Sequence, residues 1–575
     1  MTVAPKRPAA MRLAAHFPEQ TQEQWRELAA GVVNKGRPEG QHLSVDEAVA
    51  SLRSHLEGGL DIEPLYTKSP DPVLLGVPGA MPFTRGRALR DADVPWDVRQ
   101  LHDDPDAAAT RKLVLADLEN GVTSVWLHVG ADGLAADDIA GALADVQLDL
   151  APVVVSSWDD QTAAADALYA VLSGSRAASG NLGHDPLGAS ARMGSAPDLS
   201  SLADAVRRLA DHGEIRAITI DSRVYADAGC TVTDEVGFAL ASGVAYLRHL
   251  EAEGVDVAEA FRHIEFRVSA TADQFLTAAA LRALRRAWAR IGESIGVPEK
   301  SRGAFTHAVT AGRMFTRDDA WTNILRSTLA TFGASLGGAE AVTVLPFDTV
   351  SGLPTPFSRR IARNTQILLA EESNVARVTD PAGGSWYVEA LTDEVAQAAW
   401  TAFQEIEAAG GMSDALANGI VAQRITAAVV ERDSALATRA TPITGVSTFP
   451  LSGEKPLERK PRAELTTQPN ALAPHRDSIV FEGLRDRAAA YARDNGHAPR
   501  VAVPLLEVPR AADLRIDAVN LLTVAGIHAV DASDADASGV GAALPATGKG
   551  YGGISKGMDV VAFLSALLDE MEAPA

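Results

Sequence analysis

Short, β-branched apolar segments alternate with longer amphipathic segments between about residues 95 and 400. The apolar segments have the length and composition of strands that are buried on both faces of a parallel sheet. Six of them predict strands, at 124–130, 151–157, 215–222, 264–270, 304–310 and 341–347. Helical periodicity predicts intervening helices at 158–173, 200–212, 233–253, 271–292 and 318–336. This alternation favours an α/β fold built on an eight-stranded (β/α)8 TIM-type barrel, in which two further strands are assumed.

The region before the barrel has a different pattern. Residues 18–58 predict two helices, and the second begins at Ser44, because Glu47 three residues later completes a capping-box sequence. Residues 61–72 are rich in proline and predict an extended arm. Residues 1–18 hold three basic residues and no acidic one, and we interpret them as a loose arm rather than a targeting segment.

The region after the barrel changes composition twice. Residues 391–432 predict helix, 441–470 have the composition of a linker, and 478–494 predict another helix. From 500 onward a strand–helix–strand–helix pattern predicts a shortened flavodoxin-like α/β domain, since one βαβ unit takes roughly 30 residues. We therefore predict four regions, which are an N-terminal arm with helices (1–80), the barrel (81–410), a helical and linker segment (411–498) and the shortened domain (499–575).

The charge of the chain limits its partners. Asp and Glu number 75 against 52 Lys and Arg, which gives a formal net charge of −23. This charge repels phosphate backbones and anionic lipids, so we expect neither nucleic acid nor membrane as a partner. Cys230 is the only cysteine, so no internal disulfide can form, and we expect a reducing, cytoplasmic location.

The histidines do not form a metal-binding pattern. The sequence has no His-Glu-x-x-His motif and no cysteine pair, so we expect no metal site. His128 and His307 lie on predicted strands, where each could act as a ligand only with partners from other strands. A hydrogen-bonded histidine in the core or at the rim of the barrel is the default interpretation for both.

Three polar segments are candidates for other chemistry. The glycine-rich stretch 174–188 predicts a loop that could cradle phosphate, although it lacks the spacing of a known phosphate loop. The alternative is a tight loop whose glycines adopt positive φ. Residues 539–550 resemble a P-loop but have glycine after Lys549, so we interpret them as a flexible connector. Residues 357–374 begin with arginines and continue with Asn364, Thr365 and Gln366, which either line a site or join the last barrel helix to its neighbour.

Several segments together resemble the methylmalonyl-CoA mutase family. They are "DIEPLYT" (61–67), "PFTRG" (82–86), "PWDVRQ" (95–100), "LRALRRAWARIGE" (281–293), "FDTVSGLPTPFSRRIARNTQ" (347–366) and "ESNVARVTDPAGGSWYVEALT" (372–392). The block 347–392 is the most specific of these. Within the family, "GNLGHDPLG" (180–188) is similar to a stretch in the small (beta) subunit of the bacterial heterodimer.

The resemblance implies a radical rearrangement that interconverts (R)-methylmalonyl-CoA and succinyl-CoA on adenosylcobalamin. It implies that the acyl-CoA passes through the (β/α)8 barrel and that cobalamin sits between the barrel and the C-terminal domain. A histidine in an Asp-x-His-x-x-Gly loop of that domain is the lower cobalt ligand in the family. The cofactor then supplies the radical chemistry, and the protein binds and orients the reactants.

This sequence departs from the family pattern at the residues that carry the chemistry. Asp91 stands where the family has a tyrosine near the reacting carbons, and Val224 stands where it has a histidine that bonds the thioester carbonyl. Valine can neither donate a proton nor polarise a carbonyl. Ala511 stands at the cobalt-ligating histidine. We therefore expect no catalytic residue and no cofactor-binding residue in this chain, and a degenerate cobalamin-binding-like domain at 499–575.

The resemblance and these departures together predict a non-catalytic small subunit of adenosylcobalamin-dependent methylmalonyl-CoA mutase. Its partner would be a catalytic large subunit that carries the adenosylcobalamin, in a heterodimer of propionate metabolism. The N-terminal helices and the 61–72 arm are the candidates for the contact between the subunits.

Two alternatives remain open at this point. The chain could be a stand-alone acyl-CoA mutase with a variant ligand set, in which His497 or His528 reaches cobalt. It could also be a barrel that binds acyl-CoA without turnover. Strand alternation places Trp126 and His128 on one face of their strand, and bulky side chains directed into the barrel would argue against substrate entry.

Overall fold

The computed structural model describes residues 18, 20–67, 76–91, 94–531, 540–547 and 550–572. The chain forms two compact units, Met1–Ser69 and Pro70–Ala575, which are described separately. The interpretation of residues 1–18 as a loose arm falls almost entirely outside the described residues, and so does the part of the predicted 61–72 arm from residue 68 onward.

The N-terminal unit holds two helices and a hairpin. Helix α1 (Gln22–Asn34) and helix α2 (Val45–Ala50) pack against each other, and a single 3-10 turn (Glu39–Gln41) lies between them. The capping box predicted at Ser44 is present, since its side chain and that of Glu47 exchange hydrogen bonds with the opposite backbone amides. Strands β1 (Ser54–Leu56) and β2 (Leu60–Ile62) pair antiparallel, so the first two residues of the predicted arm belong to a strand.

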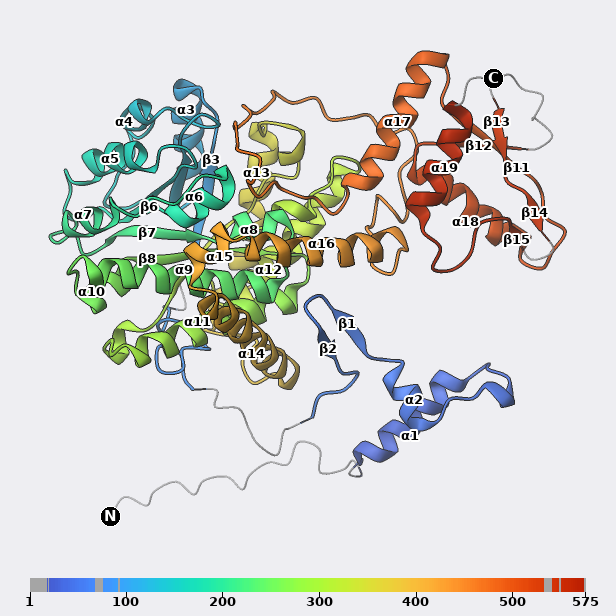
Figure 1. The fold of residues 1–575 in the computed structure, drawn as a ribbon, viewed down its shortest axis with the longest axis horizontal. Helices are drawn as coiled ribbons and strands as arrows, with labels where there is room; N and C mark the ends of the chain where they lie inside the picture. The colour runs from blue at the N-terminus through green and yellow to red at the C-terminus, as the bar shows by residue number, and fades with distance from the viewer. Residues whose placement is uncertain are drawn as a thin grey trace. The chain divides into compact units, whose positions relative to one another are not determined.

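Eight parallel strands close into a barrel in the second unit, which confirms the predicted fold (Figure 1). In barrel order they are β3 (Asp97–His102), β4 (Ser124–His128), β5 (Val153–Ser156), β6 (Gly180–His184), β7 (Ile215–Asp221), β8 (Ile264–Ala270), β9 (Phe305–Thr310) and β10 (Ala341–Thr343). The six predicted strands are all present. The two that were assumed are β3 and β6.

Helices surround the barrel and connect consecutive strands (Figure 1). The longer ones are α3 (Ala107–Leu118), α5 (Gln161–Leu172), α6 (Pro186–Met193), α9 (Val232–Ala252), α11 (Gln274–Ser294), α12 (Asn323–Leu336) and α13 (Pro356–Ile367). Shorter ones are α4 (Ile139–Ala142), α7 (Leu202–Arg207), α8 (Arg223–Ala228) and α10 (Val257–Arg262). A π-helical turn, η7 (Leu368–Glu372), continues α13, and helices α14 (Trp386–Ala408), α15 (Met412–Ala417) and α16 (Ile420–Ala437) follow.

Strand β6 corrects the interpretation of 174–188 as a phosphate-binding loop. Its glycines are required by the neighbouring strand, because a Cβ at Gly183 would lie 2.1 Å from the carbonyl oxygen of Val155. Gly183 also has a φ of +74°, which side-chain-bearing residues rarely adopt. The segment continues directly into helix α6, which Asp185 caps. The glycines therefore serve strand pairing, not a ligand.

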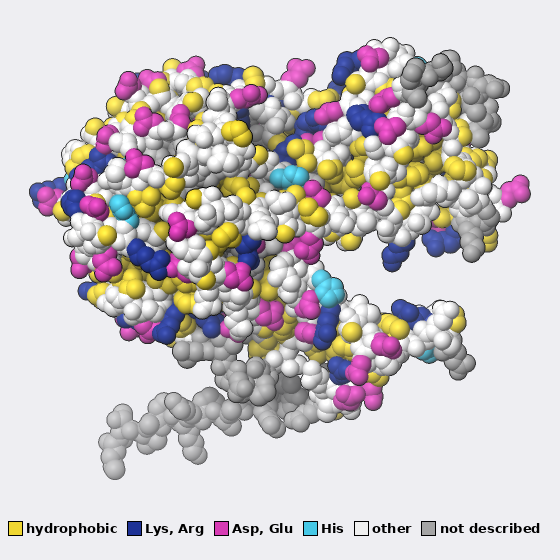
Figure 2. Space-filling view, in the orientation of Figure 1, with side chains coloured by type: hydrophobic (Ala, Val, Ile, Leu, Met, Phe, Trp, Pro, Cys, Tyr) yellow, Lys and Arg dark blue, Asp and Glu magenta, His cyan; other side chains and the backbone are white. Residues whose placement is uncertain are grey.

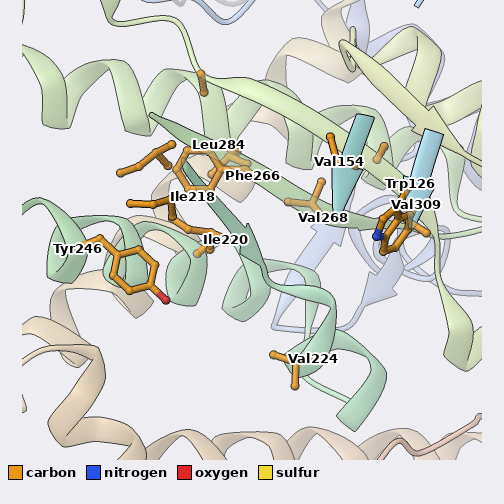
Figure 3. Packing of buried hydrophobic residues seen from close by; sticks show 14 of the residues in the cluster. Trp126, Val154, Ile218, Ile220, Val224, Tyr246, Phe266, Val268, Leu284 and Val309 are labelled. Atoms are coloured by element: carbon orange, nitrogen blue, oxygen red, sulfur yellow. The ribbon is translucent and has the colours of Figure 1, made fainter. Parts of the chain in front are cut away.

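The main core lies between the strands and the surrounding helices. Trp288 of α11 stacks on Phe261 with ring centroids 4.4 Å apart and meets the edge of Phe266 at 4.9 Å. Figure 3 shows Ile218 and Leu284 beside Phe266 in this layer. Because these apolar side chains point outward from the strands, the alternate positions of the same strands point into the barrel.

Residues 441–478 contain no helix or strand but are bonded to the barrel. Backbone amides of Gln468, Leu472 and His475 donate to carbonyl oxygens of Met193, Ala191 and Asp227 at 2.7–2.8 Å. The amide of Leu353 donates to Lys460 in the same way. The composition of a linker therefore belongs to a segment that lies against the barrel; residues 459–477 are called the strap below.

The C-terminal region is a three-stranded parallel sheet with helices. The strand order is β12 (His528–Asp531), β11 (Arg500–Val503), β13 (Val540–Ala543), and the helices are α17 (Ile479–Asn495), α18 (Ala511–Val524) and α19 (Val560–Glu572). Strands β14 (Ala546–Thr547) and β15 (Gly550–Tyr551) form a small hairpin. The interpretation of 539–550 as a flexible connector is therefore wrong, because its described residues form β13 and this hairpin.

Candidate functional site: the barrel axis and its two mouths

The inside of the barrel near the amino ends of its strands holds a buried ionic network. Arg99 donates to Glu265 at 2.9 Å, to Asp97 at 3.1 Å and to Ser124 at 3.0 Å. Asn181 donates to the second carboxylate oxygen of Glu265 at 3.2 Å. Arg99 is 2% and Glu265 1% exposed, so the pair lies out of contact with solvent. Each charge in this layer has a partner, as burial demands.

A second layer lies closer to the carboxyl ends of the strands. Arg267 donates to Asp221 at 3.1 Å and to His307 at 3.1 Å, and its guanidinium lies 4.0 Å from the ring centroid of Trp126. Arg223 forms a bidentate pair with Asp221 at 2.6 and 2.8 Å and also covers Trp126. The tryptophan is therefore held between two guanidinium groups inside the barrel.

Burial and neighbouring charges fix the protonation of these groups. Burial by itself would raise the pKa of Glu265, but the positive charges of Arg99, Arg216 and Arg267 outweigh it and lower that pKa. Burial lowers the pKa of His307 well below its usual value, and Arg99 and Arg267 lower it further. The network therefore consists of charged arginines and carboxylates around a neutral imidazole.

The two layers separate two cavities at opposite ends of the barrel. A cavity of about 460 Å³ at the amino ends of the strands has Arg99 and Glu265 in its wall. A cavity of about 180 Å³ at the carboxyl ends is lined by Trp126, Arg223 and Val224, among others. Since Glu265, Arg267 and Trp126 are at most 1% exposed, the axis between the cavities is filled by side chains.

The two departures from the family's barrel residues do not meet at one place. Val224, on α8, lines the cavity at the carboxyl ends of the strands. Asp91 is exposed, and its neighbours Arg90 and Val94 line cavities that open beside the amino ends of the strands. This exposure leaves the Asp91 carboxylate in contact with water, where an ionised group has no desolvation cost.

The two candidate histidines lie inside the barrel and at its rim. His128 ends β4, with Nδ1 3.1 Å from the Ser156 hydroxyl and Nε2 2.8 Å from Asp132. His307 Nε2 lies 2.8 Å from the hydroxyl of Thr343. Within the described residues, no group of three or more His, Cys, Asp or Glu side chains could hold a metal ion. Both positions match the default interpretation, which is a hydrogen-bonded histidine.

The strap covers the cavity at the carboxyl ends. Leu472 and Pro474 are part of the cavity wall opposite Trp126. Nearer the start of the strap, Arg459 pairs with Asp348 at 2.5 Å, and Arg462 pairs with Asp103. Asp348 lies in the loop after strand β10, and Asp103 comes directly after strand β3. The same end of the barrel is thus bounded from within by the ionic layer, and the strap forms part of the outer wall of its cavity.

The C-terminal sheet lacks an imidazole where a cobalt ligand would be needed. In a parallel sheet, ligands bind at the carboxyl ends of the strands. Ala511 begins the helix that follows β11 and carries only a methyl group. His528 is the first residue of β12, and His497 precedes β11, so both histidines lie at the amino ends of the strands. The described residues of this domain therefore do not fit a histidine-ligated cobalamin.

Comparison with known proteins identifies the family. A family model described as methylmalonyl-CoA mutase matches residues 188–478. The methylmalonyl-CoA mutase small subunit of Propionibacterium freudenreichii subsp. shermanii is 48% identical over 490 residues, which cover 84% of this chain and 77% of that protein. The small subunit of Streptomyces virginiae is 45% identical over 558 residues, 95% of this chain and 89% of that protein.

The chain belongs to the methylmalonyl-CoA mutase family. This confirms the resemblance found in the sequence and places the chain in a family of isomerases. Similarity is lower to the methylmalonyl-CoA mutase of Rhizobium meliloti, which is 31% identical over 453 residues, 70% of this chain and 62% of that protein. None of the described helices is long and apolar enough to cross a bilayer.

The most specific mutase-family segment joins the last barrel helix to the first strand. From α13, Arg359 and Arg363 both bind Asp117 of α3, the first at 2.6 Å and the second at 2.7 Å. Gln366 accepts a hydrogen bond from the indole of Trp96 at 3.0 Å. The choice left open for 357–374 is therefore decided for Gln366 and the two arginines, which close the barrel and line neither of the two cavities on its axis. Arg359 lines a separate small pocket beside the carboxyl end of β3.

A second group of mutase-family segments meets at one buried arginine. Arg282 of α11 binds Asp380, and it binds Glu389 of α14 at 2.6 Å. Asp380 also accepts from Arg85 at 2.9 Å, which ties "PFTRG" to the other two segments. Arg285 donates to the carbonyl oxygens of residues 83, 84, 337 and 338. Arg285, through these bonds, and Arg282, through Asp380 and Arg85, hold the loop that leads into β3.

Sequence reasoning missed the ionic network itself. A signal was present, since Glu265, Arg267 and His307 are polar residues within otherwise apolar predicted strands. Glu265 and Arg267 are two residues apart and so must share one face of their strand. What the sequence could not provide is that this face is the inside of the barrel and that Arg99 and Asp221 lie opposite.

Proposed function

We propose that this chain is the non-catalytic small subunit of an adenosylcobalamin-dependent methylmalonyl-CoA mutase. It would support a large subunit that interconverts (R)-methylmalonyl-CoA and succinyl-CoA in the cytoplasm. The observation that carries this proposal is the filled barrel axis, where Arg99–Glu265 and Arg267–Asp221 replace an open channel. The coarser assignment, to the mutase family, does not depend on it.

The filled axis argues against threading of an acyl-CoA. A thioester whose reacting end lies at one mouth and whose nucleotide lies at the other needs a continuous channel for its pantetheine arm. Opening one here would separate Arg99 from Glu265 and displace Trp126, all at most 2% exposed. Breaking a buried ion pair costs about 3–5 kcal/mol, because each remaining charge is left without a partner.

The mouth of the barrel also lacks proton-transfer groups at the family's position. Val224 lines the cavity beside Trp126 and Arg223, and its isopropyl group offers no hydrogen bond to a thioester carbonyl. Asp91 is exposed in a segment beside the opposite mouth. Val224 and Asp91 therefore do not meet around one reacting carbon.

The cofactor would be carried by the partner. Ala511 cannot ligate cobalt, and His497 and His528 lie at the wrong end of the sheet. The names of the relatives from P. freudenreichii and S. virginiae as small subunits support a larger companion chain. Helix α1 is a candidate contact, because Leu28 and Val32 are 69% and 72% exposed on it, one turn apart.

The test compares the purified chain alone with the chain mixed with the large subunit encoded by the same organism. Alone, the chain should neither change the absorption spectrum of added adenosylcobalamin nor convert methylmalonyl-CoA. Mixed, the two chains should co-elute and give activity. Stoichiometric cobalamin uptake or turnover by the chain alone would support the stand-alone mutase and refute the proposal. Calorimetric binding of CoA esters without turnover would instead support an acyl-CoA-binding barrel.

A further inference from the structure

Two outer barrel helices expose a row of large apolar side chains. Trp321, Leu325 and Leu329 are 50%, 64% and 44% exposed and are spaced four residues apart, so they share one side of α12 and the turn before it. Phe357 of α13 is 44% and Leu368 of η7 is 47% exposed. Helices α12 and α13 pack against each other. These five side chains are called the α12–α13 face.

The two exposed aromatic side chains of this face, Trp321 and Phe357, pack on a buried phenylalanine. Trp321 stacks on Phe347 with ring centroids 4.6 Å apart and an interplanar angle of 27°. Phe357 lies 6.3 Å from both rings. Because Phe347 is only 2% exposed, it anchors two exposed rings to the core. Rigid aromatic side chains lose little conformational entropy on binding, which is why Trp is frequent at the centre of protein interfaces.

The charge of this face is also unusual for the chain. The 14 residues of α12 and the 12 residues of α13 include no Asp or Glu, although the chain has 75 of them, and the carboxylates of this face are Glu371 and Glu372 at the end of η7. On the side of the molecule drawn in Figure 2, by contrast, acidic and basic side chains are interspersed. The guanidinium of Arg360 covers the Phe357 ring at 5.3 Å and has no ion pair with any described residue. Depletion of carboxylates around an apolar centre is typical of interface cores.

The exposed apolar area is comparable with the largest apolar patch of a typical monomer, which is often a functional surface. The five side chains present on the order of 400 Å² of apolar surface, given the size of aromatic and leucine side chains, which is at the level that marks binding sites. A stable interface needs roughly 800 Å² from each partner, so this face would supply about half of one side.

We propose that the α12–α13 face docks the larger mutase subunit, through an apolar surface that carries a carboxylate opposite Arg360. This inference rests on the proposed function and adds a barrel surface to the contact. The unpaired cation argues for a complementary partner rather than a second copy of this chain, because a symmetric contact would bring Arg360 and its copy to the same apolar face.

The affinity test uses two matched substitutions on exposed helix positions. Leu325→Asp places a charge at the centre of the face, and Val430→Asp on α16, where Val430 is 66% exposed, is its control. With the large subunit encoded by the same organism, Leu325→Asp should raise Kd at least tenfold and Val430→Asp less than twofold. Equal Kd for both variants, with wild-type binding intact, would overturn the inference and leave the proposed function standing.

A labelling experiment identifies the occupant directly. Cys230 is buried, so a cysteine introduced by Leu325→Cys or by Val430→Cys is the only accessible thiol of the full-length chain. Addition of the large subunit should slow maleimide labelling at position 325 at least fivefold and leave position 430 unchanged. Slow labelling at 325 without the large subunit would instead show that a second copy or the chain's own N-terminal unit covers the face, and would overturn the inference. No binding by the wild type would refute the proposed function together with it.

Discussion

The Glu265 carboxylate is the best place to test whether the barrel axis is held shut by charge pairing. Glu265→Ala removes the Arg99 partner at 2.9 Å and the Asn181 partner at 3.2 Å. Arg99 keeps its ion pair with Asp97, which lies near the rim of the barrel, but it loses the fully buried carboxylate of Glu265. Removing one partner of a buried ion pair costs about 3–5 kcal/mol, so the barrel should lose up to that much free energy of unfolding.

A second substitution separates charge loss from cavity formation. Arg99→Leu combined with Glu265→Leu removes both charges and keeps most of the volume, and replacing a buried ion pair by apolar groups is often close to neutral. We therefore expect the double variant to recover at least half of the stability that Glu265→Ala loses. Asp204→Ala is the control, because its pair with Arg207 has side chains 85% and 50% exposed and should contribute less than about 1 kcal/mol.

The assay is urea unfolding near pH 7.5, followed by tryptophan fluorescence and far-ultraviolet circular dichroism. Each transition is fitted separately, since a chain with several domains need not unfold in two states. If Glu265→Ala costs less than about 1 kcal/mol, or if the double variant is no more stable than the single one, the axis is not held by paired charges. Broken charge pairs would then pose no energetic barrier to the entry of an acyl-CoA into the barrel.

Two other positions give independent predictions. Burial raises the pKa of Glu235 to about 7 from an ordinary 4.5, so its contribution to stability is complete below pH 4.5 and is lost as pH rises through 7. Glu235→Gln removes this dependence, so from pH 4.5 to 8 the variant should gain roughly 3 kcal/mol relative to wild type in urea unfolding, and parallel curves for the two proteins would refute this. Gly183→Ala should abolish soluble folded protein, because the new Cβ would lie 2.1 Å from a backbone oxygen of β5, whereas Gly141→Ala, with no atom within 4 Å, should express normally.

The strands that the sequence failed to predict are informative about the site. Strand β3 reads "DVRQLH", and its polar residues include Arg99, which faces the interior network. Strand β6 reads "GNLGH", where two glycines fit against β5 and Asn181 bonds to Glu265. Strand prediction depends on β-branched and apolar residues. It fails here because these strands contribute charge, amide groups and close backbone contact instead.

The strap shows a different limit of sequence reasoning. Its many prolines and few apolar residues indicate a linker, and it indeed has no regular secondary structure. Its partners, however, lie far away in the chain, as with Gln468 and Met193 or Arg459 and Asp348. Composition predicts the local conformation of such a segment, whereas its position over the carboxyl ends of the strands depends on contacts that no local pattern encodes.

The segments that carry the family resemblance are structural in this chain. Arg359 and Arg363 close the barrel through Asp117, and Arg282 joins three segments through Asp380 and its second carboxylate partner on α14. Every one of these groups is buried and paired, so the loss of Asp117 or of Arg282, each of which has two partners, would leave buried charges uncompensated. These residues therefore hold the barrel together whether or not the chain has a reaction to catalyse.

The positions that differ from the family pattern are free of this constraint. The side chain of Val224 lines a cavity, Asp91 is exposed, and Ala511 begins a helix at the surface of the last domain, so none of them has a buried charge to satisfy. A different side chain at any of these positions would therefore not leave a buried charge without a partner. The family motifs therefore indicate the fold, whereas the side chains along the barrel axis and at its two mouths determine which function the fold can have.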